Sequence, residues 1–462
     1  MERRVGRRAL LGAAAGALAA LVAACRGPEG ETTFRPARTV TAVGVGGGAA
    51  PANTVVIPTD LPARNPVGTI FPALPKGAPA PDLLRMIGFV PNMQDATGGL
   101  LSFLDRWKGT LTFANLGAVK KLYRYDTVHA FSDLQAQNIN VADYTNATAG
   151  CYLTEFVGLT DSQNAYRDAF GYDVFQVDRE VSAGQPPDSL SRMEGAFDAG
   201  AITATLQMGG YTPTSQDGIP YYTVRGDGEL NLSDPRGRLA LGRLNRVAVN
   251  AERITAAPTT ALITAALDAE MKRTAALDGS ATLRALATVL GTVTSMATLP
   301  PGASAVVEAV IPPEQLAATT RGWGALHPAE LNAIGYTDAG NFQRTMHVAR
   351  VYTNPSDAAA DASELVKRLQ GYRLRSQQTL LPTYATAVTS RTATVGSKGV
   401  LVADVALAPD PARGRFWIDL YLNRDTLFLV PQPIRLTGSP PPVTPAASSS
   451  ARPATPRAST TP

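Results

Sequence analysis

The amino-acid sequence predicts an α+β fold of two domains, which are duplicated split β-α-β (ferredoxin-like) units with antiparallel sheets. Helix and strand patterns alternate through residues 81–436, a segment long enough for two sizeable cores. Two parts of this segment share one order of elements: strand, capped helix, Gly-Tyr, strand. The first part contains Gly210-Tyr211 and the second contains Gly371-Tyr372, so the order of elements suggests a repeat.

The clearest unit of the first domain, residues 81–299, is a strand at 193–197 followed by a capped helix. Asp198 stands at the N-cap position, and Phe197 and Ile202 occupy the two positions of a hydrophobic staple. The other elements expected in this domain are a helix at 162–170 capped by Asp161 and ended by Gly171, a strand at 219–224, a helix started by Asp234-Pro235, a hairpin of strands 246–249 and 253–255, and helices at 260–273 and 281–290.

The second domain, residues 300–436, begins at the break Pro300-Pro301-Gly302. Its best helix is capped by Asn354 and has Pro355 at its first position. Asp357, Asp361 and Glu364 lie in its first half, Lys367 and Arg368 lie in its last turn, and Gly371 ends it, an arrangement that complements the helix dipole. The other elements expected here are strands at 305–311, 331–336, 345–352, 389–395 and 400–406, and a last helix from Pro411 with Trp417, Leu420 and Tyr421 on one face.

Residues 1–24 have the pattern of an export signal, in which basic residues precede an uncharged apolar run at 9–24. Arg7-Arg8 before that run predicts twin-arginine export, although Arg3-Arg4 is a competing pair. An uncleaved membrane helix is the alternative. The run is shorter than the roughly 20 residues that a membrane span needs, and two glycines interrupt it, so we favour cleavage.

The end of the apolar run, Val22-Ala23-Ala24-Cys25, resembles the lipobox of bacterial lipoproteins. The resemblance implies cleavage between Ala24 and Cys25 and acylation of the Cys25 thiol. Each buried methylene contributes about 0.8 kcal/mol, so two or more acyl chains would hold the protein on a bilayer. We therefore expect a protein attached to the cell membrane by a lipid anchor and facing the extracytoplasmic side.

Two low-complexity segments flank the central part of the chain. Residues 25–80 are rich in Gly, Pro, Ala, Thr and Val, and residues 437–462 are rich in Pro, Ser, Thr and Ala. Neither segment can bury enough apolar surface to offset its conformational entropy. We expect a disordered, lipid-anchored tether at 25–80 and a disordered tail at 437–462.

Charge and cysteine content exclude several classes of function. Removing residues 1–24, with four arginines and one glutamate, lowers the formal net charge from +4 to +1, so no nucleic-acid partner is indicated. Cys151 has no disulfide partner once Cys25 is acylated, and we expect it in the core. The three histidines (His129, His327 and His347) are scattered, which speaks against a His/Cys metal site.

Motifs that would carry chemistry are weak. Residues 226–234 place acids at alternating positions, as calcium loops do, but Leu232 stands where the turn glycine is needed and Asp234 is explained as a helix cap. Residues 396–399 lack the spacing of a nucleophile or phosphate loop and are explained as a turn. His347 is expected to be a hydrogen-bonded histidine within a sheet.

Four acids, Asp178, Glu180, Asp188 and Glu194, lie close together in the sequence, but no pair has a spacing that demands acid–base catalysis. The sequence therefore predicts no catalytic residue, no metal ligand and no cofactor, and we expect that the protein is not an enzyme.

A run of structural positions from Phe197 and Asp198 through Ile202 and Leu206 to Gly210-Tyr211 is similar to a unit in uncharacterised bacterial extracytoplasmic lipoproteins. Residues 241–249 and 351–371 resemble the same proteins. The resemblance covers residues 81–430 loosely and its motifs are caps, a staple and turns. It implies an α+β lipoprotein and transfers no active-site residue.

Three hypotheses of function follow. The first is a non-catalytic envelope lipoprotein that binds a small molecule, a cell-wall polymer or another envelope protein, or has a structural role there. The second is the solute-binding lipoprotein of a transporter, which would need two lobes that close on a cleft. The third is an envelope hydrolase, which would need a Ser/His/acid cluster or two carboxylates in a pocket.

Overall fold

The computed structural model describes residues 82–93, 103–154, 163–185, 188–301, 313–375 and 379–431. These residues all belong to one compact unit, which begins at Asn65. The predicted export signal (1–24), tether (25–80) and tail (437–462) lie outside the described residues, as do the predicted helix cap Asp161 and the predicted strand at 305–311.

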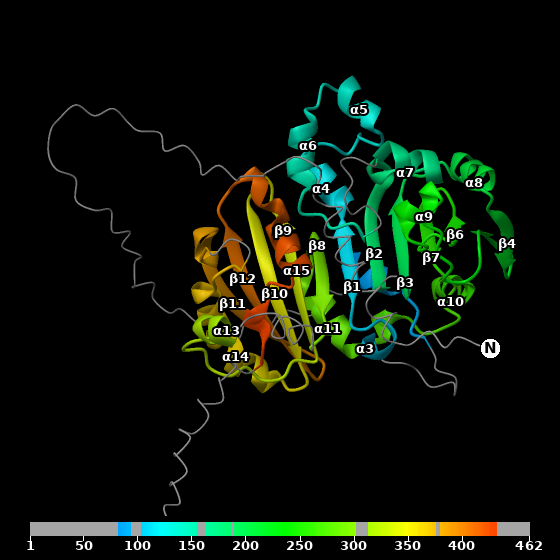
Figure 1. The fold of residues 1–462 in the computed structure, drawn as a ribbon. Helices are drawn as coiled ribbons and strands as arrows, with labels where there is room; N and C mark the ends of the chain where they lie inside the picture. Colours follow the sequence, from blue (N-terminus) through cyan, green and yellow to red (C-terminus); the bar gives the residue numbers. More distant parts are fainter. Residues whose placement is uncertain are drawn as a thin grey trace, which may run out of the picture. The chain divides into compact units, whose positions relative to one another are not determined.

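The described residues are built around one antiparallel sheet of twelve strands, in the order β11-β12-β10-β9-β8-β1-β2-β3-β7-β6-β5-β4 (Figure 1). The sequence therefore predicted the α+β class and the antiparallel pairing correctly. The strands are β1 (Leu111–Asn115), β2 (Val177–Gln185), β3 (Asp188–Gly195), β4 (Thr212–Gln216), β5 (Ile219–Thr223), β6 (Arg246–Val249), β7 (Arg253–Ala257), β8 (Ser295–Leu299), β9 (Leu331–Asp338), β10 (Arg344–Tyr352), β11 (Ala385–Val395) and β12 (Lys398–Leu407).

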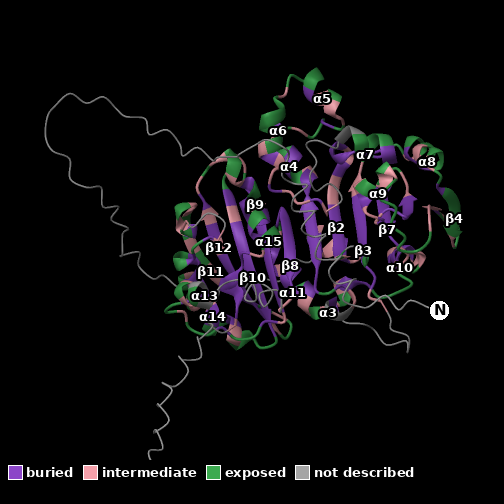
Figure 2. Cartoon of the chain, viewed as in Figure 1, coloured by how far each residue is buried: buried purple, intermediate pink, exposed green. Residues whose placement is uncertain are grey.

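Helices cover both faces of this sheet, so the fold has three layers. One face, which we call the α10 face, packs against α2 (Asp82–Ile87), α10 (Thr260–Glu270) and α11 (Ala281–Leu290) in one hydrophobic cluster that spans both halves of the sheet. The central strands are buried along most of their length (Figure 2).

The opposite face, which we call the α14 face, carries two hydrophobic clusters. Helices of the first half of the chain contribute to one cluster, and helices of the second half contribute to the other. The first group is α4 (Leu116–Leu122), α5 (Phe131–Ala136), α6 (Val141–Thr148), α7 (Gln163–Phe170), α8 (Ala199–Met208) and α9 (Pro235–Ala240), and the second is α13 (Pro313–Thr319), α14 (Pro355–Gly371) and α15 (Phe416–Leu422). The short α3 (Phe103–Arg106) precedes β1.

One half of the sheet contains a split β-α-β connection, in which α14 joins β10 to β11 and β12 lies between these two strands. In the other half α8 leads from β3 to β4 at the far edge of the sheet, and β5 and α9 follow before β6. However, the prediction of two duplicated ferredoxin-like domains is not confirmed. Strand β8, before the proposed boundary at residue 300, pairs with β9 after it over residues 295–299 and 332–336, so one sheet continues through that point.

Most local predictions are confirmed. Asp198 and Asp234 cap α8 and α9 through hydrogen bonds from the backbone N–H groups of Ala201 and Arg236, and α11 has the predicted limits. Asn354 is a correction: it occupies the N-cap position of α14, but its side chain makes no capping hydrogen bond. No helix of the described residues is long and apolar enough to cross a membrane.

Candidate functional site

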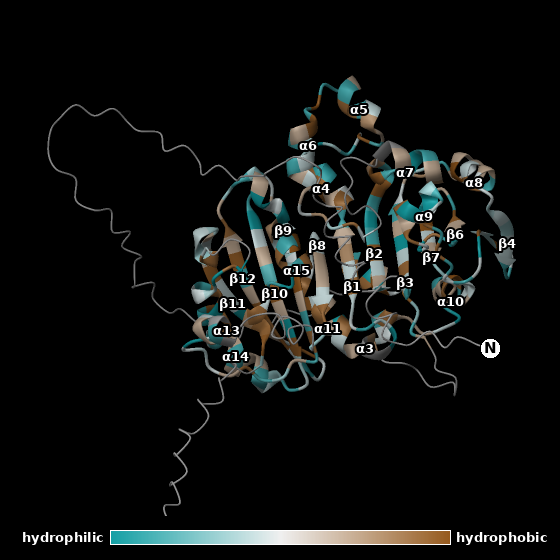
Figure 3. Ribbon diagram, viewed as in Figure 1, coloured by the Kyte–Doolittle hydropathy of each residue, from teal (hydrophilic) through white to brown (hydrophobic). Residues whose placement is uncertain are grey.

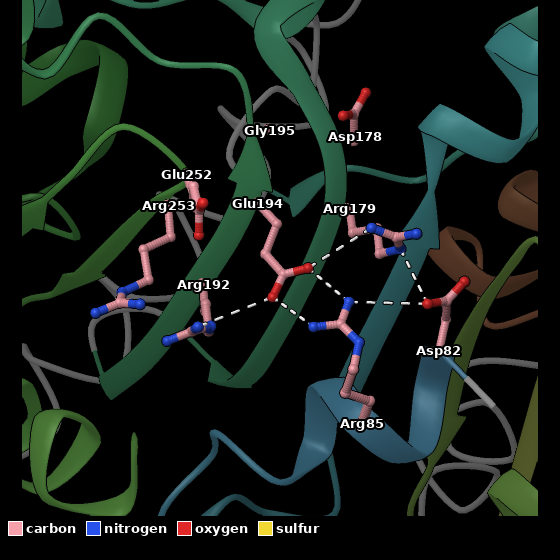
Figure 4. Close-up of a pocket in the computed structure, with 9 residues that line it drawn as sticks. All are labelled: Asp82, Arg85, Asp178, Arg179, Arg192, Glu194, Gly195, Glu252 and Arg253. Carbon is pink, nitrogen blue, oxygen red and sulfur yellow. Dashed lines mark hydrogen bonds and ion pairs between the residues drawn. The ribbon is translucent and has the colours of Figure 1, made fainter. Parts of the chain in front are cut away.

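An open cleft of about 420 Å³ lies on the α10 face, at the end of the sheet where β2 begins and β3 ends (Figure 4). Its walls are almost entirely charged. Helix α2 and strands β2, β3 and β7 contribute most of the lining residues, which are Asp82, Arg85, Asp178, Arg179, Arg192, Glu194, Gly195, Glu252 and Arg253. We call this feature the arginine cleft.

The strand register aligns three of these charges in a row. Arg179 of β2 is the direct partner of Glu194 of β3, and Glu194 is the direct partner of Arg253 of β7. Cross-strand partners project to the same face of a sheet, and opposite charges there attract each other. Hydrophilic residues accordingly make up much of strands β2 and β3 (Figure 3).

Glu194 is the centre of the charge network. Arg85 donates two hydrogen bonds to it, Nη1 to Oε1 at 2.8 Å and Nη2 to Oε2 at 2.6 Å, which is a bidentate ion pair. Nη1 of Arg179 and Nη2 of Arg192 lie 3.7 and 3.8 Å from the same carboxylate. Burial alone would raise the pKa of Glu194, but the hydrogen bonds from Arg85 and the charges of the three arginines outweigh it and lower the pKa.

Arg192 forms the floor of the cleft and is almost fully buried, with 5% of its side chain exposed. Its guanidinium group lies 3.7 Å from the centre of the Phe89 ring and donates to Glu270 at 2.8 Å. Burial lowers the pKa of Arg192 even though Glu270 opposes the shift. The buried Nε of Arg192 has no hydrogen-bond acceptor among the described residues. A buried donor of this kind is normally satisfied by water or by a ligand.

Helix α2 is fixed to the sheet by the same network. Asp82 accepts a hydrogen bond from Asn115 of β1 at 2.8 Å and lies 3.1 Å from Nε of Arg179. Gly195 closes the cleft where β3 approaches the start of β2. A Cβ atom there would lie 1.9 Å from the carbonyl oxygen of Gln176, so only glycine fits. These contacts hold the arginines on rigid elements.

Cationic and anionic side chains alternate around the cleft. Four arginines (Arg85, Arg179, Arg192 and Arg253) and four acids (Asp82, Asp178, Glu194 and Glu252) line it, and Glu270 pairs with Arg192 and Arg253. Arg85, Arg179 and Arg253 keep about a third of their side chains exposed, at 38%, 31% and 32%. Each guanidinium has five N–H donors in a planar fork that matches carboxylate and phosphate groups. The arrangement is therefore suited to bind an anion.

The four acids noted in the sequence separate in the structure. Glu194 is central to the cleft and Asp178 lies at its rim. Glu180 instead accepts hydrogen bonds from Thr154 and Ser191, and Asp188 pairs with Arg106.

The other predicted site residues are placed as follows. The export and lipidation residues Arg7, Arg8, Ala24 and Cys25 lie outside the described residues. Cys151 is half-buried, and burial raises the pKa of its thiol to about 12.

Asp227 and Asp234 of the loop at 226–234 form ion pairs with Arg246 and Arg225, respectively. Both carboxylates are therefore already paired with cationic side chains. In the described part of the chain, no three His, Cys, Asp or Glu side chains are placed to hold a metal ion.

His347 lies in mid-strand, as predicted, with both ring nitrogens hydrogen-bonded. Its Nδ1 lies 2.6 Å from Oδ1 of Asp404 and its Nε2 lies 2.8 Å from Oγ1 of Thr337. Arg391 donates to the second oxygen of Asp404 at 2.8 Å. This row has the connectivity of a hydroxyl–imidazole–carboxylate triad, which the sequence did not suggest. It lies on the sheet surface rather than in the arginine cleft.

The arginine cleft was also missed from the sequence. Its residues come from four segments that only the strand order brings together, and the one local signal was the alternation of Arg192 and Glu194 along a strand. No protein-family model, curated protein or solved structure matches the chain.

Proposed function

We propose that this protein is a lipid-anchored protein of the extracytoplasmic membrane surface that binds a small anionic ligand without transforming it. The arginine cleft is the binding site in this proposal. The ligand carries carboxylate or phosphate groups, the chemistry that guanidinium groups recognise best.

The location rests on the sequence. The basic and apolar segments before Cys25 and the Val22-Ala23-Ala24-Cys25 run are the pattern of an exported, acylated protein. Membership among bacterial extracytoplasmic lipoproteins is part of the proposal and rests on the same residues.

The single observation that carries the binding role is the set of four arginines around one open cleft, three of them partly exposed. The ion pairs use some of the five N–H donors of each guanidinium group and hold the groups in place. An anion that enters the cleft therefore meets hydrogen-bond donors that are already ordered. Binding then costs little further side-chain entropy, which favours affinity. The unsatisfied Nε of Arg192 adds a buried donor at the floor.

The two other hypotheses receive no specific support. A solute-binding protein of a transporter would need two lobes around its cleft, whereas the arginine cleft is lined by one sheet and one helix. A hydrolase would need its nucleophile in a pocket, and the Thr337–His347–Asp404 row lies elsewhere. We therefore propose the non-catalytic binding role alone.

Native mass spectrometry of the protein purified from its own membrane tests both parts of the proposal. We expect acyl mass on Cys25 and, separately, a reproducible anionic adduct on the folded part. Calorimetric titration with citrate and with inorganic phosphate then tests the cleft directly. The double variant Arg179→Gln/Arg253→Gln should lose at least tenfold in affinity for the probe that binds.

Arg273 supplies the matched control, because it is also ion-paired, with Asp217 and Asp268, but lies outside the cleft lining. Arg273→Gln should leave the affinity unchanged. The binding proposal fails if neither adduct nor probe binds, or if both variants weaken binding equally. The location fails separately if Cys25 carries no acyl chain.

A further inference from the structure

Strand β11 forms an unusually exposed edge of the sheet. It is eleven residues long, about twice the usual strand length, and among the described strands it pairs only with β12. Its sequence, Ala-Thr-Ala-Val-Thr-Ser-Arg-Thr-Ala-Thr-Val, contains no proline and one charge. Natural edge strands are normally short or carry lysine, proline or a bulge, because an open row of N–H and C=O groups recruits another strand.

The one charge in β11 does not protect the edge. The guanidinium group of Arg391 is turned inward, with hydrogen bonds to Asp404 at 2.8 Å and to the carbonyl oxygen of Val289 at 3.1 Å. The single register irregularity lies at the start of the strand, between Ala385 and Ala387. The rest of the strand is regular and uncharged at its edge.

The opposite edge of the sheet is different. Strand β4 has five residues, one of which is Pro213, and its first four residues are exposed. A strand of this length with a missing N–H cannot cover an eleven-residue edge. Head-to-tail pairing of β11 with β4 would also leave open ends and produce a polymer. Among the described strands, the only edge that matches β11 in length is β11 of a second copy.

We infer that two copies of this chain associate through β11, pairing antiparallel about a twofold axis and continuing the sheet from one copy into the other. Twofold pairing of identical strands closes at two copies. It continues the antiparallel pairing found throughout this sheet, and no unpaired like charges meet across the junction.

The position of α14 supports a second copy as the occupant. Helix α14 packs on β11 and β12 more than on β10, so it lies close to the edge. Because neighbouring strands are about 4.8 Å apart, a helix centred over β11 and β12 lies about 5 Å from the proposed axis. Two such helices would then be about 10 Å apart, which is the distance of packed helices.

Packing at this distance requires small side chains where the helices meet. Glu364 and Lys367 bond to Gly324 and Gly322, which lead to His327 over β10. The opposite flank of α14 therefore faces the β11 edge, and in the first half of the helix it carries the small residues Ala359 and Ala362. The strand edge and the helix surface are independent features, and both suit a second copy. A lone extended peptide would pair with the strand but would leave this helix surface unused.

Sedimentation velocity of the full chain tests the inference, with Cys25→Ser to exclude association through acyl chains. We expect a reversible dimer between about 1 and 100 μM. The double variants Thr389→Lys/Thr394→Lys and Thr389→Glu/Thr394→Glu place two like charges on exposed β11 positions. Each should weaken self-association at least tenfold, because four like charges are then brought close together along the paired strands.

A mixture of the lysine and glutamate variants should associate again, which a folding defect could not produce. Thr212→Lys/Thr214→Lys on the exposed edge β4 is the matched control and should dimerise like the unchanged chain. The inference is overturned if the unchanged chain stays monomeric throughout, or if both charged variants still dimerise. It is also overturned if only a chain ending at Pro431 dimerises, since residues after 431 would then occupy the edge.

Discussion

Replacing Glu194 by glutamine should move stability and anion affinity in opposite directions. The substitution keeps the shape of the side chain and removes the negative charge at the centre of the arginine cleft. Arg85 loses its bidentate carboxylate partner, and Arg179 and Arg192, 3.7 and 3.8 Å away, lose an attractive charge. The same change frees these arginines to attract an external anion.

The size of each effect follows from the geometry. Hydrogen bonds to charged groups contribute about 1.5–3 kcal/mol, and glutamine keeps one acceptor, so the free energy of unfolding should fall by about 2 kcal/mol. An anion between Arg179 and Arg253 would lie roughly 7 Å from Glu194, where the repulsion is about 2.4 kcal/mol at an effective dielectric constant of 20. Physiological salt reduces this to about 1 kcal/mol, so affinity should rise roughly fivefold.

Urea unfolding and calorimetric titration with citrate or phosphate measure the two quantities. Glu314→Gln, on the exposed surface of α13, is the control and should change neither. If Glu194→Gln lowers stability but leaves affinity unchanged or lower, the network is structural and the anion does not bind in the arginine cleft.

The pH dependence provides a second check on Glu194. Its pKa is lowered in the folded protein, so the carboxylate stabilises the fold above its ordinary pKa of about 4.3. That stabilisation is lost as the pH falls through the lowered folded value. The stability difference between the unchanged chain and Glu194→Gln should therefore be constant from pH 5 to 7 and shrink below about pH 4.

Three further predictions concern ionisable groups outside the arginine cleft. Asp338→Asn should lower the free energy of unfolding by about 3–5 kcal/mol in urea, because it leaves the fully buried Arg344 without its carboxylate partner at 2.9 Å. Cys151, with its pKa raised to about 12, should resist dithionitrobenzoate at pH 8 in the folded protein and react once unfolded. The hydrogen bond and charge of Asp361 raise the pKa of His327, so Asp361→Asn should lower that pKa toward 6.5 in an NMR titration. The ion pair of protonated His327 with Asp361 should stabilise the fold fully below pH 6.5, and this stabilisation should be lost as the pH rises through the raised pKa.

Local signals in the sequence predicted local structure well. Helix caps depend on one side chain and a backbone N–H two or three residues away, so Asp198 and Asp234 were recognisable from their positions. Asn354 fits the same pattern but makes no capping bond. The rule predicted where that helix starts, but not what the side chain does.

Non-local pairing could not be predicted in the same way. Strands β1 and β8 at the centre of the sheet are five residues long and buried on both faces. They therefore lack the alternation that marks a half-buried strand, and both were missed. Because β8 ends at Leu299, immediately before Pro300-Pro301, the break that follows a central strand looked like a boundary between two domains.

The arginine cleft and the Thr337–His347–Asp404 row occupy the same end of the same sheet face. In one row of directly paired residues, Phe113 of β1 is followed across the sheet by Met296, Gly335 and His347. In the next row on the same face, Asn115 of β1 is followed in the other direction by Arg179 and Glu194. The polar groups of the His347 row are all paired with one another or with a neighbouring side chain. The His347 ring is bonded at both nitrogens and Asp404 is shared with Arg391.

The backbone around the Thr337–His347–Asp404 row is engaged in strand pairing. His347 and Thr337 both lie within paired strands, where ladder pairing uses backbone N–H groups and leaves few free to stabilise an oxyanion. The arginine cleft, by contrast, holds three partly exposed guanidinium groups in place and has a buried donor without an acceptor among the described residues. Oriented donors at an open cleft favour the binding of an anion, so the arginine cleft is where a ligand should be sought.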